Sequence, residues 1–346
     1  MIIFENDYAA GCAPEIMERL AASNLEQTTT YGKDDYCKRA SQMILEQAQL
    51  PEGEVFYFVG GTIANATAAS YLLRPYQGVL CAASAHITAH EAGAIEAGGN
   101  KVLTIPSEDG KLTPDQIEQA VMAYRNDHAW QQLVEPGMVY ISQSTENGTV
   151  YNKAELEGLH EVCQKYGMPL YVDGARLGYG LAAPGNDVTL ADLGRLCDMF
   201  YIGGTKQGAL FGEAMVICNP AYRQGFSNMM RHKGAVLAKG RLMGIQFETL
   251  FEDGLYFRLA AYANKLAMKI RGVLEEKGCV LPYDNRTNQQ FVLWPVETIR
   301  QVEQQYQLYD FGPQAPSGLH LARFTTSWYT KEEDVDALVA DLRRWL

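Results

Sequence analysis

Two short apolar runs that break into glycine decide how this sequence folds: Leu170-Tyr-Val-Asp-Gly-Ala-Arg176 and Asp198-Met-Phe-Tyr-Ile-Gly-Gly-Thr-Lys206. Each run is typical of a strand buried on both faces, and each presents a polar side chain where the apolar residues end. Open α/β sheets bind their ligands at the carboxyl ends of parallel strands. We therefore expect Asp173 and Lys206 to lie together at that edge of one sheet.

Similar apolar runs recur along the chain between amphipathic stretches, a pattern that predicts β-α units and a mostly parallel sheet. The helices between them have recognisable starts: Thr62 as the cap of a helix over 63–73, Thr113-Pro114 before a second, and Asn152 before a third that ends at Gly167. The fold class is therefore α/β, with a large domain whose seven-stranded sheet is sandwiched by helices. The expected strands are 55–58, 78–81, 101–105, 138–142, 170–173, 199–202 and 214–218.

The second part of the chain differs in pattern and predicts a smaller domain. A length of 346 residues suits a large domain plus a small one. One long amphipathic helix over 242–276 is expected to connect them, followed by an α+β unit with strands near 290–293 and 319–325 and a terminal helix from Lys331. We expect the N-terminal segment and large domain to span 1–245, and the connector helix and small domain to span 246–346.

The polar stretch over 24–38, rich in threonine and tyrosine, has two interpretations. It forms a surface excursion, or it folds over the active site of this subunit or of a neighbour.

Composition and charge exclude several classes of protein. The net charge of −12 argues against a nucleic-acid or anionic-membrane partner. The seven cysteines are scattered without C-x-x-C spacing, so neither a disulfide framework nor a zinc site is expected. The N-terminus does not have the pattern of a signal peptide, and no apolar stretch has the length of a membrane helix. We expect a cytoplasmic enzyme that acts on a small molecule.

Lysine and aspartate at neighbouring strand ends predict a pyridoxal phosphate (PLP) site. The amine of Lys206 can form a Schiff base, and the Asp173 carboxylate can keep a pyridine nitrogen protonated. Arg176 is a candidate for binding a carboxylate or for a place near the phenolic oxygen of the cofactor. Each residue also has a simpler interpretation: Asp173 as a helix cap, and Lys206 as a solvated loop lysine. The small residues around Lys206 favour a desolvated amine with a lowered pKa.

Two further stretches contribute candidates. Gly60-Gly-Thr62 follows a strand and opens a helix, which suits a phosphate but also suits an ordinary helix start. Neither a dinucleotide-binding nor a P-loop pattern follows that strand, so a nucleotide is disfavoured. His86 and His90 have the spacing of a metal-binding pair, but no third ligand is evident, and no metal is expected. An imidazole can also stack on a pyridine ring and transfer protons near neutral pH.

Taken together, these motifs resemble the low-specificity L-threonine aldolases, a group within the PLP-dependent fold-type I (aspartate aminotransferase-like) enzymes. The resemblance covers most of the chain, and Asp-Gly-Ala-Arg followed at this distance by the lysine is its most specific part. It is carried by Asn6-Asp-Tyr8, Gly60-Gly-Thr-Ile-Ala-Asn65, Ala85-His-Ile87, Glu91-Ala-Gly-Ala94, Gly110-Lys-Leu-Thr-Pro114, Ser144-Thr-Glu-Asn-Gly148, Asp173-Gly-Ala-Arg176, Gly204-Thr-Lys206 and Arg323-Phe-Thr-Thr-Ser-Trp328.

The resemblance implies a role for each matching residue. Lys206 binds PLP covalently, Asp173 pairs with its pyridine nitrogen, and His86 stacks on its ring. Gly61 and Thr62 hold the phosphate, while Arg241 corresponds to a basic residue that reaches the phosphate of a neighbouring subunit. Arg176 and Arg323 bind the substrate carboxylate, Asn6 contributes to substrate binding, and His128 falls near a second active-site histidine. The family also implies a homotetramer, a dimer of dimers, with composite active sites.

Two departures bear on the substrate. Gly60 stands where the family has serine, and Asn6-Asp7-Tyr8 replaces Ser-Asp-Thr, so a hydroxyl contact is missing or replaced. These changes leave the cofactor site intact and the choice of substrate open.

The activity implied is PLP-dependent retro-aldol cleavage of L-threonine or L-allo-threonine to glycine and an aldehyde, by a carbon-carbon lyase. His86 and His128 are both candidates for the base. The alternatives are another fold-type I reaction (β-elimination, transamination or a phenylserine-type aldol cleavage) and a non-catalytic homologue.

Overall fold

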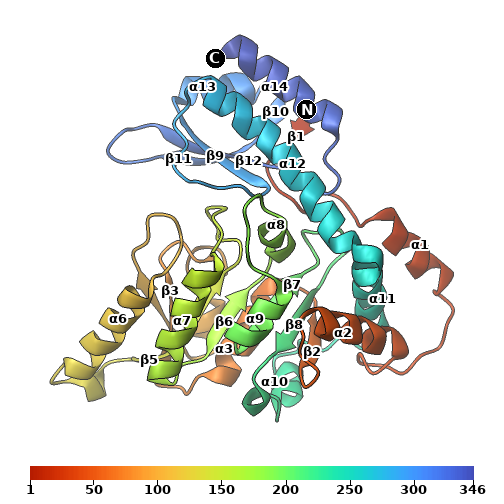
Figure 1. The fold of residues 1–346 in the computed structure, drawn as a ribbon, viewed down its shortest axis with the longest axis vertical. Helices are drawn as coiled ribbons and strands as arrows, with labels where there is room; N and C mark the ends of the chain where they lie inside the picture. Colours follow the sequence, from red (N-terminus) through yellow and green to blue (C-terminus); the bar gives the residue numbers. More distant parts are fainter.

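The structure is a computed structural model that describes residues 1–346. A seven-stranded sheet forms the centre of its larger part (Figure 1). The strand order is β2-β8-β7-β6-β5-β3-β4, and only β8 runs antiparallel to its neighbours. The predicted α/β sheet is confirmed, with each expected strand within three residues of its observed bounds. These are β2 (Glu54–Phe58), β3 (Gln77–Ala82), β4 (Lys101–Ile105), β5 (Glu135–Ser142), β6 (Leu170–Asp173), β7 (Met199–Gly203) and β8 (Glu213–Ile217).

Helices cover both faces of this sheet because side chains alternate along its strands. In β7, Phe200 and Ile202 pack into one apolar cluster, whereas Met199 and Tyr201 pack into another on the opposite face. The first face is covered by α1 (Pro14–Ala22), α2 (Asp35–Gln47), α6 (Pro114–Asn126), α7 (Lys153–Tyr166), α9 (Leu190–Leu196) and α11 (Arg241–Phe251). The second is covered by α3 (Gly61–Leu72), α4 (His86–Ala89), α5 (Ala94–Ala97) and α10 (Phe226–His232).

The predicted helix starts are confirmed for two helices and wrong for the third. Thr113 and Asn152 both form capping boxes, and Gly167 ends α7 in the left-handed conformation. Thr62 is not a cap, because α3 begins at Gly61, two residues earlier than predicted, and the extended Gly60 takes the cap position. Gly60 has no side chain to cap the helix, so the first amides of α3 are free of a side-chain acceptor.

The long connector predicted over 242–276 is two helices rather than one. α11 ends at Phe251, a short 3-10 turn follows over Glu252–Gly254, and α12 runs over Leu255–Glu276. The break has a backbone cause: Asp253 and Gly254 adopt positive φ angles of 52° and 67°, which cannot continue a right-handed helix.

α12 leads to a smaller body with its own apolar cluster (Figure 1). The predicted strands and terminal helix are confirmed as β9 (Gln289–Trp294), β12 (His320–Thr325) and α14 (Glu332–Trp345). β9, β12 and β11 (Tyr309–Pro313) form an antiparallel sheet, and α13 (Val296–Val302) follows β9.

The N-terminus packs with this smaller body. β1 (Ile2–Ile3) pairs in parallel with β10 (Tyr306–Gln307), and Phe4 lies in the apolar cluster there. The division expected between residues 245 and 246 falls inside α11 and stays a prediction. None of the helices combines the length and apolar character needed to cross a membrane.

Candidate active site

Asp173 is the most completely hydrogen-bonded carboxylate at the carboxyl edge of the sheet. Its Oδ2 accepts hydrogen bonds from the Tyr140 phenol at 2.6 Å and from Asn65 Nδ2 at 2.9 Å. Its Oδ1 accepts from the Tyr201 phenol at 2.5 Å and from the Ala175 amide at 2.9 Å. Burial alone raises the pKa of Asp173, but the donors from both tyrosines and the amide outweigh it and hold the pKa below the ordinary value. The residue is therefore a buried, ionised carboxylate.

Lys206 follows β7 and presents an amine without a fixed partner. Its Nζ forms no hydrogen bond or ion pair, and the nearest aromatic ring, that of Tyr8, has its centroid 5.9 Å away. Burial is the main cause that lowers the pKa of Lys206, and the positive charge of Arg176 adds to it. A partly buried amine with a lowered pKa is the nucleophile that an imine-forming site requires.

The N-terminus of α3 forms the third part of the site. Gly60, Gly61 and Thr62 line a cavity of about 510 Å³ together with Lys233, and no side chain caps the helix there. A Cβ added at Gly61 would lie 2.8 Å from the Tyr201 phenol oxygen, so the tyrosine fits only against glycine. Free amides and the helix dipole make this end of α3 suitable for an anion such as phosphate.

A chain of hydrogen bonds connects His86 to Asp173. His86 Nδ1 lies 2.7 Å from Glu91 Oε1, and Asn65 Nδ2 donates both to that oxygen at 2.8 Å and to Asp173 Oδ2. The His86 amide also donates to Glu146 Oε1 at 3.1 Å. The imidazole of His86 is therefore fixed by its surroundings, as an imidazole that stacks on a ring must be.

The two arginines differ in their partners. Arg176 donates from Nε and Nη2 to the two oxygens of Asp7, at 2.8 and 2.9 Å. Arg323 donates to the Gln289 side-chain oxygen at 3.0 Å and to the Glu5 carbonyl at 3.1 Å, and its buried Nε has no partner. Burial lowers the pKa of Arg323 to about 10, with the charge of Arg176 as the second cause. Arg323 therefore has a free hydrogen-bond donor, its Nε, that can bind an anion.

Three residues expected in the site form no hydrogen bond with Asp173 or Lys206 within this chain. His128 is exposed after α6, which begins beyond the carboxyl end of β4 and runs back to the opposite edge of the sheet, next to the start of β5. Arg241 begins α11 and donates to the Asn24 carbonyl at 3.3 Å, while its Nη1 has no partner. Asn6 accepts from the Tyr8 amide at 3.1 Å, so its side-chain oxygen is used in a local turn.

Sequence reasoning missed the residues that surround Asp173. Tyr140 lies two residues before the end of β5, and Tyr201 two residues before the end of β7, so both face the same side of the sheet as the Asp173 carboxylate. Strand alternation alone would have indicated them. Glu213 at the start of β8 was also missed; it accepts from the Gly204 amide at 3.0 Å and from the Thr205 hydroxyl at 2.9 Å.

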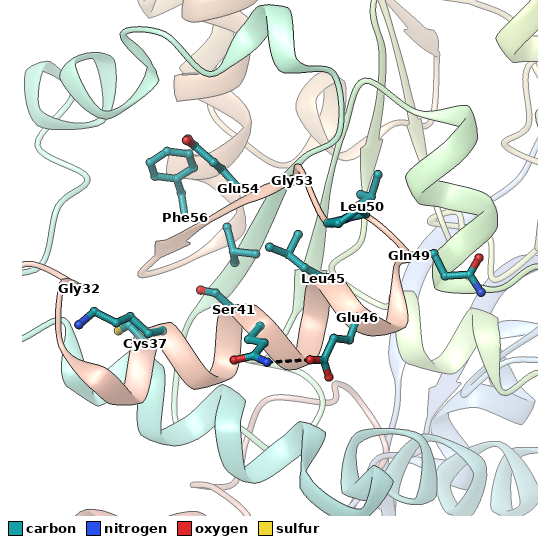
Figure 2. A pocket seen from close by; sticks show the side chains of 14 residues that line it. Gly32, Cys37, Ser41, Leu45, Glu46, Gln49, Leu50, Gly53, Glu54 and Phe56 are labelled. Atoms are coloured by element: carbon teal, nitrogen blue, oxygen red, sulfur yellow. Dashed lines mark hydrogen bonds between the residues drawn. The ribbon is translucent and has the colours of Figure 1, made fainter.

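The site is also distinct from a large cavity elsewhere in the structure. A cavity of about 810 Å³ is lined by α2 and the edge strand β2, and Figure 2 shows Ser41, Leu45 and Glu46 on the helix and Glu54 and Phe56 on the strand. None of its lining residues is among the candidates for catalysis or cofactor binding.

Comparison with known proteins identifies the family of this chain. The model of the beta-eliminating lyase family matches residues 4–297. The chain belongs to the beta-eliminating lyase family. Within that family, it is 31% identical to a low specificity L-threonine aldolase from Pseudomonas sp. (strain NCIMB 10558), over 98% of this chain and 96% of the relative. The solved structure of a threonine aldolase from Leishmania major is 41% identical, covers 99% of both chains and superposes with a TM-score of 0.95.

A third comparison, with a more distant solved structure, concerns only the fold of the chain. Cystalysin from Treponema denticola, whose solved structure contains pyridoxal 5'-phosphate, is 14% identical and superposes with a TM-score of 0.74 over 99% of this chain. Such a likeness shows that the two chains share a fold. It agrees with the observed seven-stranded sheet and small antiparallel sheet.

The residues present fit the cofactor that this family implies. PLP carries an aldehyde, a basic pyridine nitrogen and a phosphate, and the site offers one matching group for each. Lys206 has an unpaired amine, Asp173 is an ionised buried carboxylate, and the N-terminus of α3 is uncapped. The fit rests on three separate elements, which meet at one edge of the sheet.

Proposed function

We propose that this chain is a PLP-dependent carbon-carbon lyase that cleaves L-threonine and L-allo-threonine to glycine and acetaldehyde. The observation that carries the proposal is the ionised Asp173 and the unpaired Lys206 at adjacent strand ends, in a chain 31% and 41% identical to threonine aldolases. PLP, when bound, supplies the electron sink that makes cleavage at Cα possible.

The cofactor would be held by residues on three elements. Lys206 would bind its aldehyde carbon, Asp173 would face its pyridine nitrogen, and the amides of Gly61 and Thr62 would hold its phosphate. His86 would lie against the ring, because Glu91 and Asn65 fix its orientation.

Arg323 would bind the substrate carboxylate through its free Nε. Arg176 would contribute mainly by its charge and through Nη1, since Asp7 uses its other two donors. Asn6 would contact the substrate through its amide nitrogen. A carboxylate held in this way orients the bond from Cα to Cβ relative to the cofactor, which decides which bond breaks.

The proposal also includes a homotetrameric assembly and a cytoplasmic location. A homotetramer with composite sites would give Arg241 and His128 a role across an interface, and the unpartnered Nη1 of Arg241 supports this. Sedimentation velocity of the PLP-loaded protein measures the assembly. A cytoplasmic location is supported by seven unpaired cysteines, five of them buried.

Replacing Lys206 tests the function directly. The Lys206→Ala variant should lose covalent PLP, seen as the absence of a pyridoxyl mass adduct after borohydride reduction, and should lose acetaldehyde release from L-threonine. Lys165→Ala is the matched control, because Lys165 forms only an exposed pair with Glu118. Retained turnover in Lys206→Ala would exclude the proposed chemistry.

Product analysis separates the alternatives on the same scaffold. Acetaldehyde and glycine from L-threonine support the aldolase. Ammonia and a keto acid from serine or cysteine, without acetaldehyde from threonine, would indicate a β-eliminating lyase instead. Faster cleavage of L-phenylserine than of either threonine isomer would indicate a bulkier substrate.

A further inference from the structure

Two imidazoles lie side by side at the site, and they differ in how they are held. The ring centroids of His86 and His90 are 5.6 Å apart, with an angle of 48° between the ring planes. His86 is fixed through Nδ1 by the buried carboxylate of Glu91, and Glu91 is tied through Asn65 to Asp173. A ring fixed in this way suits a positioning role at the cofactor.

His90 has neither a fixed orientation nor a partner. It follows the short helix α4 as the C-cap residue, its side chain forms no hydrogen bond or ion pair, and the residue is exposed. Both of its ring nitrogens are therefore available to a substrate. A candidate base must reach the proton that it removes, and a side chain at the mouth of the site with free rotamers can do so.

The charges that face His90 come from four different elements. His86 lies beside it on α4, Arg176 precedes α8 (Leu177–Leu181), Lys206 follows β7, and Arg323 lies on β12. Partial burial is the first cause that lowers the pKa of His90, and the neighbouring His86 and the positive charges of Arg323, Lys206 and Arg176 are the others. A lowered pKa keeps the imidazole neutral near pH 7, so that a lone pair is present to accept a proton.

The other histidine considered as the base does not lie at this place. His128 is exposed beyond the C-terminal end of α6, at the amino edge of the sheet, whereas Asp173 and Lys206 lie at the carboxyl edge. Within one chain, His90 is the free imidazole closest to the hydrogen-bonded chain that ends at Asp173.

We propose that His90 is the general base of the aldol cleavage; the proposal rests on the function proposed above. His90 takes the proton of the substrate β-hydroxyl, and the O–H electron pair becomes the second bond of the aldehyde carbonyl. The bond between Cα and Cβ breaks, its electron pair is left at Cα, and Cα then takes up a proton; PLP, when bound, would supply the electron sink for that pair. One proton is removed and one is returned, so threonine yields glycine and acetaldehyde without another reactant.

The decisive variant is His90→Gln, measured in two reactions of the PLP-loaded enzyme. Cleavage of L-threonine needs the β-hydroxyl proton to leave, and general-base catalysis contributes typically about 100-fold or more, so kcat should fall by about that factor. Exchange of the glycine α-proton in D₂O involves no β-hydroxyl and should stay within a few-fold of wild type. His160→Gln is the control, since the Nδ1 of His160 bonds only the Leu196 carbonyl, which glutamine can also reach.

The pH dependence supplies an independent readout. In the wild type, kcat/KM should fall toward acidic pH with a pKa below the ordinary histidine value of 6.5. In His90→Gln this fall should be absent. NMR titration of the imidazoles in the cofactor-free protein should assign the same low pKa to the resonance that His90→Gln removes.

The possible results separate the two proposals. Acetaldehyde release by the wild type together with near-normal release by His90→Gln overturns the role of His90. Loss in His128→Gln with retention in His90→Gln assigns the base to a histidine from a neighbouring subunit and overturns it too. Absence of acetaldehyde from the wild type contradicts the proposed function itself.

Discussion

Asp7 holds the guanidinium of Arg176 through two hydrogen bonds, from Nε at 2.8 Å and from Nη2 at 2.9 Å. The carboxylate is completely buried and receives a third hydrogen bond from Asn288 at 2.9 Å. Burial by itself raises the pKa of Asp7, but Arg176, Lys206 and Asn288 together hold it below the ordinary value. The pair links the first residues of the chain to the loop that follows β6, and it gives Arg176 a partner before any substrate arrives.

Breaking this pair should destabilise the protein. In Asp7→Asn the buried Arg176 loses its counter-charge, and removing one partner of a buried ion pair costs about 3–5 kcal/mol. Urea unfolding at pH 7 measures the change in the free energy of unfolding. Asp35→Asn is the control, because the side chains of the Asp35–Lys38 pair are 78% and 68% exposed and their loss should change stability far less. Equal effects of the two substitutions would contradict a structural role for the buried pair.

The parts of the site predictable from sequence share one property: they end a buried strand or begin a helix. Asp173 and Lys206 stand where an apolar run meets glycine, so chain order alone places them at one edge of the sheet. The central strands could be predicted for the same reason, since both of their faces are apolar. The family resemblance then supplied Arg323, which no local pattern indicates.

The features that sequence could not supply depend on contacts between distant residues, and the roles expected of Arg176 and His128 stay predictions. Arg176 was expected to bind substrate, but Asp7, 169 positions away, receives two of its donors. His128 was placed by a loose motif match, whereas α6 carries it to the far edge of the sheet. The break at Asp253 was missed because apolar periodicity continues across it while the backbone does not.

Substitution of Arg323 should weaken substrate binding more than cofactor binding. Hydrogen bonds to charged groups contribute about 1.5–3 kcal/mol, so Arg323→Gln should raise KM for L-threonine by roughly 10- to 100-fold. The PLP absorbance of the loaded protein should stay unchanged, since Arg323 contacts Gln289 and Glu5 rather than the residues expected to hold PLP. Arg343→Gln, which removes an exposed pair with Glu276, is the control. An unchanged KM in Arg323→Gln would assign the carboxylate to another residue.

A methyl group at Gly61 should disturb the cofactor site. The added Cβ would lie 2.8 Å from the Tyr201 phenol oxygen, which cannot retreat freely because it is buried and donates to Asp173. We expect Gly61→Ala to weaken PLP binding by at least about tenfold, or about 1.4 kcal/mol, in an equilibrium titration of absorbance. Gly272→Ala is the matched control, because no atom lies within 4 Å of a Cβ at that helical position. Wild-type affinity in Gly61→Ala would show that Tyr201 moves without cost.

Titration of the Glu213 carboxyl group should make the free energy of unfolding depend on pH. Burial raises the pKa of Glu213 from 4.5 to about 8, although Thr205 and Gly204 donate to it and Lys206 lies near. Between these values the folded state retains a proton that the unfolded chain has lost. The unfolded state binds fewer protons there, so this residue makes the free energy of unfolding fall as pH rises from about 4.5 to about 8.

The variant Glu213→Gln removes that titration while keeping both contacts, since an amide can accept from Gly204 and donate to the Thr205 hydroxyl. In the cofactor-free protein, the variant should gain stability relative to wild type as pH rises from 5 to 8. The gain should reach up to about 4 kcal/mol, since each pH unit in this range contributes about 1.4 kcal/mol. Urea unfolding across this range measures the difference, and parallel curves for the two proteins would show that Glu213 is ionised throughout.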